Sequence, residues 1–224
     1  MRVAIIGGTG KLGSSLAIAF ANSNEVIIGS REKEKAVTKA NELSDVFGIN
    51  LKGMSNSDAC AESEVIIVSV PYSGMDSILS NIEENVKGKV VISSVVPFVK
   101  RNGYFFYSSS TSAAEELASK LSHARVCSAF HTVPYSLLAR KRIGIKMDVP
   151  VASDSKGTYE VVSRLILSAD GMRPLYSGPL FVSRYIEGTT VLLLNIAIHN
   201  SLRNPFIKII TDKESLGLNE ESDS

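Results

Sequence analysis

The chain has 224 residues, of which 44% are hydrophobic and 21% are charged, and its formal net charge at pH 7 is +1. A chain of this size and composition can bury a full core, and its near-neutral charge argues against nucleic acid as a partner. Two distant cysteines and three histidines without metal-ligand spacing argue against a disulfide scaffold and a metal site, so we expect a cytoplasmic protein.

The chain opens with an apolar run, Val3 to Ile6, that is typical of a buried strand and leads into a glycine-rich loop. The loop has the pattern G-x-G-x-x-G and consists of Gly8, Thr9, Gly10, Lys11, Leu12 and Gly13. In such a loop Gly8 would allow the tight turn, Gly10 would let a pyrophosphate approach the backbone, and Gly13 would let the following helix pack closely on its strand. An ordinary glycine-rich turn has a similar composition, but the strand before it and the helix after it favour a dinucleotide site.

The end of the second expected strand, residues 25–29, indicates which dinucleotide binds. An NAD site places a carboxylate there to accept a hydrogen bond from the ribose 2′-hydroxyl. This chain has Ser30 and Arg31 instead, with Lys35 one helical turn later and Thr9 in the glycine loop. A guanidinium and an ammonium attract a 2′-phosphate. A solvated helix start would contain similar residues, yet together with the missing carboxylate they predict NADP(H).

Strand and helix patterns alternate through the first two-thirds of the chain. We expect further strands at residues 49–52, 64–70, 89–93 and 125–130, and helices at residues 32–46, 73–82 and 112–121. A capping box opens the last of these helices. Six strands joined by crossovers predict an α/β fold of the Rossmann type, with a doubly wound parallel sheet.

The last third of the chain has a different pattern, with strands at 148–152 and 172–175, a helix at 155–168, and a long apolar helix from residue 181 toward residue 203. We divide the chain into an NADP-binding domain (1–147), a small C-terminal α/β domain (148–210) and a disordered tail (211–224). The apolar run at 189–198 is about half the length of a membrane span, so we expect a buried helix and no membrane contact. A largely apolar helix needs cover on all sides, which a second copy can supply, and this predicts a homodimer.

Three strand ends at the expected cofactor edge carry a Val-Pro pair, which are Val70-Pro71 (followed by Tyr72), Val96-Pro97 and Val133-Pro134. Proline commonly ends strands, but three pairs at one edge predict an apolar wall around a planar ring. His131 is either a hydrogen-bonded structural residue or a contact to a carbonyl of the substrate ring.

Two common catalytic patterns are missing. The long helix has no lysine between residues 183 and 204, and the chain has no Tyr-x-x-x-Lys sequence. Dehydrogenases that act on hydroxyl groups need such an acid or base. We therefore expect a substrate that exchanges a hydride without a protein proton donor, as a second redox cofactor does.

These motifs occur in the same order as in a known family. The glycine loop, Gly29 to Arg31, the Val-Pro pairs, residues 130–134 and 148–151, and the block from Gly171 to Leu180 closely resemble the coenzyme F420-dependent NADP oxidoreductases of archaea and some bacteria. The resemblance covers about residues 1 to 200. It implies a dimer that passes a hydride between the nicotinamide of NADP and the 5-deazaflavin ring of F420.

The resemblance also implies roles for individual residues. The 2′-phosphate contacts would be Thr9, Ser30, Arg31 and Lys35, and the nicotinamide would be lined by Val70, Pro71, Val96 and Pro97. Residues His131 to Pro134 would lie against the deazaflavin. Arg184 and Thr190 would lie near the dinucleotide site and the dimer interface.

Two departures from the family pattern leave the identity of the second ring open. Residues 200–205 stand where family members have a turn with glycine and methionine, and Gly188 stands where a hydroxyl side chain is frequent. An NADPH-dependent flavin or ferric reductase that uses FMN or FAD is therefore an alternative. A non-catalytic NADP-sensing module is another.

Overall fold

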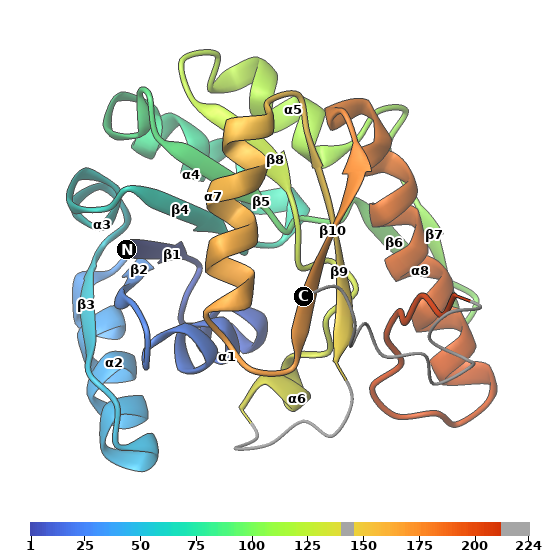
Figure 1. Ribbon diagram of the computed structural model, residues 1–224, viewed down its shortest axis with the longest axis horizontal. Coiled ribbons are helices and arrows are strands. Elements are labelled where there is room, and N and C mark those ends of the chain that lie inside the picture. The colour runs from blue at the N-terminus through green and yellow to red at the C-terminus, as the bar shows by residue number, and fades with distance from the viewer. Residues whose placement is uncertain (140–145, 212–224) are drawn as a thin grey trace, which may run out of the picture.

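The computed structural model describes residues 1–139 and 146–211, and its centre is one eight-stranded sheet with the order β10-β9-β8-β5-β4-β1-β2-β3 (Figure 1). The strands are β1 (Arg2–Ile6), β2 (Glu25–Ser30), β3 (Leu51–Ser55), β4 (Val65–Val68), β5 (Val90–Ser93), β8 (Arg125–Ser128), β9 (Met147–Ser153) and β10 (Met172–Gly178). Six neighbouring strands of this sheet, in the order β8-β5-β4-β1-β2-β3, are parallel to one another. They have the predicted doubly wound arrangement, so the Rossmann-type fold is confirmed.

Helices cover both faces of the sheet. They are α1 (Lys11–Phe20), α2 (Lys33–Phe47), α3 (Asn56–Glu62), α4 (Met75–Ile82), α5 (Ala113–Lys120), α6 (Tyr135–Leu138), α7 (Lys156–Leu167) and α8 (Ser183–His199). Alternate residues of β1 belong to two separate cores: Val3 and Ile5 pack with α1, α2 and α7, while Ala4 and Ile6 pack with α3, α4 and α5. Burial on both faces is the reason that the strands are almost continuously apolar.

The C-terminal strands extend the same sheet. β9 pairs antiparallel with β8, and β10 pairs parallel with β9, so the region after residue 147 adds an edge to the Rossmann sheet. The capping box at Ser112 and Glu115 is confirmed at the start of α5. The domain boundary at residue 147 stays a prediction, and most of the predicted tail, from residue 212, lies outside the described residues.

Sequence patterns missed three local features. The third strand begins two residues later than expected, α3 was not expected, and neither was the hairpin of β6 (Phe98–Arg101) and β7 (Tyr104–Tyr107). The hairpin was overlooked because its apolar residues do not fill a core: Phe98, Tyr104 and Phe106 are all exposed.

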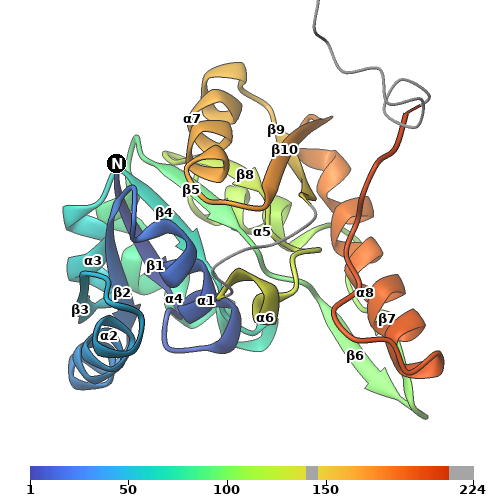
Figure 2. The same ribbon diagram turned by 60° about the horizontal axis from the view of Figure 1, so that its bottom comes forward.

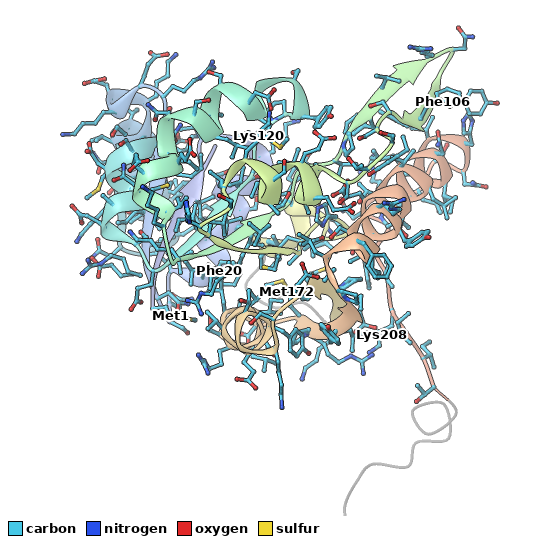
Figure 3. All side chains as sticks on the ribbon, turned by 90° about the horizontal axis from the view of Figure 1, so that it is seen from above. Met1, Phe20, Phe106, Lys120, Met172 and Lys208 are labelled. Atoms are coloured by element: carbon cyan, nitrogen blue, oxygen red, sulfur yellow. The ribbon has the colours of Figure 1, made fainter. Side chains whose placement is uncertain are left out.

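The hairpin and α8 lie side by side and project from the body of the protein, with Phe106 near the outer end (Figures 2 and 3). The side-chain amide of Asn195 on α8 donates to the carbonyl oxygen of Phe105 and accepts from its N–H, both at 2.9 Å. The expectation that α8 is buried is wrong within a single chain, because several of its apolar side chains, such as Tyr185 and Leu192, are exposed. By length and composition alone, the segment Leu180–His199 would also pass as a membrane-crossing helix.

Candidate active site

The glycine loop connects β1 to α1 at the carboxyl edge of the sheet, and close backbone packing explains its glycines. We expected Gly8 to allow the tight turn. In the structure the residue of this turn with a positive φ, of 79°, is Gly7. Gly8 is buried, and its N–H lies 3.1 Å from the Ile5 carbonyl oxygen and 3.2 Å from that of Gly29. A Cβ at Gly13 would lie 2.6 Å from the Gly7 carbonyl oxygen, so this glycine lets the helix pack on the loop itself.

The start of α1 is open to a ligand. Gly10 is the N-cap residue, it is exposed, and no side chain caps the first-turn N–H groups of this helix. A Cβ at Gly10 would meet only the Gly7 carbonyl oxygen, at 3.2 Å, so the space above Gly10 is free. Unpaired N–H groups at a helix start form an anion site, and a pyrophosphate fits this cradle.

One cavity of about 520 Å³ is lined by several of the predicted dinucleotide residues. Its lining includes Gly7, Thr9, Gly10, Ser30, Arg31, Lys35, Val70 and Pro71. The structure therefore brings the glycine loop, the end of β2 and the end of β4 together around one space. We call it the first cavity.

The basic residues of the first cavity differ in their partners. The Lys35 ammonium lies 2.6 Å from the Glu32 carboxylate, and both side chains are more than half exposed. Within the described residues, the Arg31 guanidinium has no ion pair or side-chain hydrogen bond. The Ser30 hydroxyl accepts a hydrogen bond from the Glu32 N–H at 3.4 Å. Among the described residues that line the first cavity, Arg31 is thus the free cation and Glu32 is the only carboxylate.

The other strand-end residues lie farther from the first cavity. The Tyr72 hydroxyl donates to the Glu116 carboxylate on α5, with oxygen distances of 2.8 and 2.9 Å. Burial and Glu116 raise the pKa of Tyr72. Val96 and Pro97 connect β5 to β6, and they are absent from the described linings of both the first cavity and the second one described next.

A second cavity of about 330 Å³ has Leu12, in the first turn of α1, in its wall. It is mostly apolar, and it is lined by Leu12, His131, Thr132, Val133, Pro134, Tyr135, Thr190, Leu193, Leu194, Ala197, Asn204 and Pro205. The Val133-Pro134 pair and His131 therefore meet here, and Thr190, which we expected near the dinucleotide site and the dimer interface, lies in the same wall. The Lys11 ammonium lies 5.6 Å from the centre of the Tyr135 ring at the same helix start.

His131 is the unusual polar group of the second cavity. It is 7% exposed, and neither ring nitrogen has a hydrogen-bond partner among the described residues. Burial lowers the pKa of its imidazole to about 4, although the Val95 backbone opposes this shift. The ring is therefore neutral at pH 7, and because the Val95 backbone can engage only one of its nitrogens, the other is left for a ligand.

Thr190 and Arg184, both on α8, have different surroundings. The Thr190 hydroxyl donates to the His131 carbonyl oxygen at 3.0 Å, which ties α8 to the residue that faces the second cavity. Arg184 does not reach the first cavity. Its guanidinium lies 3.6 Å from the Glu115 carboxylate, and it lines a separate hollow with Tyr107 and Gly188.

Sequence reasoning missed Glu187, which anchors α8. Its side chain is completely buried, and its carboxylate accepts hydrogen bonds from the Tyr107 hydroxyl at 2.7 Å and from the N–H groups of Ala113 and Ala114 at 3.0 and 3.2 Å. Burial raises its pKa to about 7 in spite of these donors. A glutamate within an apolar helix was the available signal, since such a residue is seldom buried without partners.

Comparison with known proteins agrees with this geometry. Residues 2–97 match the family model described as "NADP oxidoreductase coenzyme F420-dependent". The chain is 36% identical over 219 residues to the F420-dependent NADP reductase of Methanothermobacter thermautotrophicus, covering 93% of this chain and 94% of the relative. It is 35% identical over 218 residues to the enzyme of the same name from Methanocaldococcus jannaschii, covering 93% and 98% of the two chains.

A solved structure shows the same fold. The crystal structure of a putative F420-dependent NADP reductase from Arthrobacter sp. FB24 matches with a TM-score of 0.80 at 21% identity. The match covers 94% of this chain and all of that chain. The C-terminal strands and the long helix are therefore included in the shared architecture.

Proposed function

Because the chain belongs to the family of F420-dependent NADP reductases, we propose that it is an oxidoreductase that transfers a hydride between NADP(H) and coenzyme F420. Two cavities whose walls include residues at the start of α1 support this proposal, since hydride transfer needs two rings near one another. The deazaflavin and the nicotinamide supply the redox chemistry when bound. The work of the protein is to bind the rings, orient them and exclude water.

The first cavity fits NADP(H). The open N–H groups at the start of α1 would hold the pyrophosphate, and the space above Gly10 lets it approach. Arg31 and Lys35, with the hydroxyls of Thr9 and Ser30, would hold the 2′-phosphate. Val70 and Pro71 give this cavity an apolar edge, against which the nicotinamide would lie.

The second cavity fits a flat heterocycle with polar edges. Its apolar walls from α8 and the Val133-Pro134 pair would cover the ring faces, and His131 would bond a carbonyl or nitrogen on the ring edge. A neutral imidazole is a poor proton donor, which agrees with a reaction that moves a hydride and leaves no hydroxyl proton to handle. The buried His131 without a partner is the observation that carries this part of the proposal.

The direct test is to mix the purified protein with NADPH and oxidised F420 and to follow the deazaflavin absorbance. We expect the absorbance of the oxidised ring to fall in proportion to the NADPH consumed. FMN and FAD should give little NADPH oxidation in parallel reactions. Tight NADPH binding with no change in deazaflavin absorbance would refute the proposed reaction, and faster FMN turnover would support a flavin reductase.

We also propose that the enzyme is a cytoplasmic protein that binds small redox cofactors. We further propose that it is a homodimer. A single chain leaves apolar side chains exposed on the hairpin and α8: Tyr104 and Phe106 on one face of the hairpin, Phe98 on its other face, and Tyr185, Leu192 and Ile196 along one side of α8. These side chains are between 37% and 66% exposed. Exposed apolar surface of this kind on adjacent elements marks an interface, and a second copy would cover it.

Sedimentation velocity tests the dimer. We expect the wild-type protein to sediment as a dimer and Leu192→Glu to sediment as a monomer, because a carboxylate in the apolar interface would lose its hydration. Leu167→Glu is the matched control, since Leu167 is also exposed but lies at the end of α7, outside the hairpin and α8. A wild-type monomer, or an equal shift in both variants, would refute the assignment of the interface.

A further inference from the structure

The chain turns back after α8 and lies against the body of the protein as an extended segment. Ser201 and Asn204 have positive φ values of 53° and 56°, and they form this turn. In Figure 2 the segment leaves the end of α8 and runs back along that helix. We call residues 203–210 the C-terminal strap.

The strap is part of the wall of the second cavity. Asn204 and Pro205 line this cavity together with His131. The Asn204 side chain is hydrogen-bonded to the Ser136 hydroxyl on α6, and Phe206 packs against the apolar core. The position of the strap therefore determines the shape of the second cavity.

A buried ion pair holds the strap. The Asp148 side chain has no exposed surface, and Arg173 binds its carboxylate with two nitrogens, at 2.7 and 2.9 Å. The same carboxylate accepts a hydrogen bond from the Ile209 N–H, and Arg173 donates to the Ile209 carbonyl oxygen at 3.0 Å. The Asp148 N–H also donates to the Ile207 carbonyl oxygen at 3.0 Å.

These bonds fix a segment that has few other attachments. The strap residues are at best half-buried, and Arg203, Ile209 and Ile210 are exposed. Segments with few buried contacts open locally at low cost. Charge-assisted bonds to both backbone polar groups of Ile209 raise that cost, because such bonds are about twice as strong as neutral ones.

We propose that Asp148 and Arg173 form a clasp that positions the strap as a wall of the second cavity and so sets the affinity for the deazaflavin ring. The inference rests on the proposed function, because it takes the second cavity as the deazaflavin site. Asp148 and Arg173 act through the strap and are positioning residues. Asp148 lies on β9 and Arg173 on β10, in the two sequence blocks that carry the family resemblance but had no assigned role.

The test is Asp148→Asn, which keeps the shape of the side chain and removes its charge. We expect the KM for F420 to rise about tenfold, the effect of weakening one hydrogen bond to a charged group. We expect the Kd for NADPH to change less than about twofold, which also shows that the variant is folded. Trypsin should cleave after Arg203 and Lys208 faster than in the wild type, and intact mass reports this without any cofactor.

Two further variants separate positioning from a general loss of stability. Arg173→Lys keeps the charge but loses the two-nitrogen geometry, so it should move the F420 KM in the same direction by a smaller factor. Asn204→Gly keeps the positive φ and removes the wall side chain. Combined with Asp148→Asn, its effect on the F420 KM should be less than additive, because both changes disturb one wall.

The control is Glu25→Gln, which removes a carboxylate that pairs with Arg2 and Lys52 on other strands. It should leave the trypsin rate and both cofactor affinities unchanged. An unchanged F420 KM in Asp148→Asn, or equal losses of NADPH and F420 binding, would overturn the clasp. Absence of hydride transfer in the wild type would refute the proposed function instead, and the trypsin rates would still report on the clasp.

Discussion

The sharpest prediction concerns the choice of NADP(H) over NAD(H), and it uses the substitution Arg31→Ala. Arg31 lines the first cavity and has no ion pair within the described residues, so its guanidinium is available to a 2′-phosphate without breaking another bond. Losing a hydrogen bond to a charged group costs about 1.5–3 kcal/mol. NADPH should therefore bind about 10- to 150-fold more weakly, while NADH binding should be nearly unchanged.

The neighbouring residues provide two comparisons. Lys35→Ala should cost less than about 1.4 kcal/mol, because this exposed ammonium is shared with Glu32. Glu32→Gln removes the carboxylate of the same wall, so it should strengthen NADPH binding and leave NADH binding unchanged. Weaker NADPH binding in Lys35→Ala and stronger NADPH binding in Glu32→Gln are expected together only if the 2′-phosphate lies close to both side chains.

Fluorescence titration of the wild type and of each variant with NADPH and NADH gives two dissociation constants for each protein. Circular dichroism checks that the variants are folded. If Arg31→Ala weakens NADH and NADPH equally, Arg31 contacts a group that the two cofactors share. If Glu32→Gln weakens NADPH, the wall does not hold the 2′-phosphate.

Three other predictions follow from the packing. Gly13→Ala should lower the melting temperature, because its Cβ would lie 2.6 Å from a backbone carbonyl, whereas Gly10→Ala should leave the melting temperature nearly unchanged and weaken NADPH binding. Glu187 has a pKa raised from 4.5 to about 7, so wild-type stability should fall by up to about 3 kcal/mol as the pH rises through this window. Urea unfolding at several pH values should show this slope in the wild type and not in Glu187→Gln. Thr190→Val removes the hydrogen bond to the His131 carbonyl and should raise the F420 KM by about tenfold or less, with little change in the NADPH Kd measured by titration.

The parts of the site that sequence reasoning located are local in the chain. The glycine loop, the end of β2 and the Val-Pro pair after β4 each combine a turn or strand end with nearby polar residues, and doubly wound topology brings them to one edge. The order of the six parallel strands was predictable for the same reason. Even here, the spacing does not reveal that Gly7 is the residue with a positive φ, or that a Cβ at this position would lie 2.3 Å from the Ser69 carbonyl oxygen.

The parts that sequence reasoning missed depend on contacts between distant residues. Glu187 binds N–H groups more than seventy positions earlier, and Asp148 binds the backbone of residue 209, some sixty positions later. Nothing in the local pattern of either residue indicates its partner. The hairpin was missed because its exposed aromatic residues match neither a buried strand nor an ordinary surface loop.

The contrast between features that are local in the chain and contacts between distant residues also distinguishes the two proposed cofactor sites. The NADP half is built mainly from the loop and strand ends of the Rossmann sheet, and close backbone packing fixes its glycines. The second cavity is built from α8, α6 and the C-terminal strap, which are held by a few side-chain bonds such as Thr190 to His131 and Ser136 to Asn204. A change in these few bonds can reshape the second cavity while the first cavity stays intact. We therefore expect that substitutions in α8, α6 and the strap change which second ring the enzyme accepts. Substitutions near Arg31 should change its preference between NADP(H) and NAD(H).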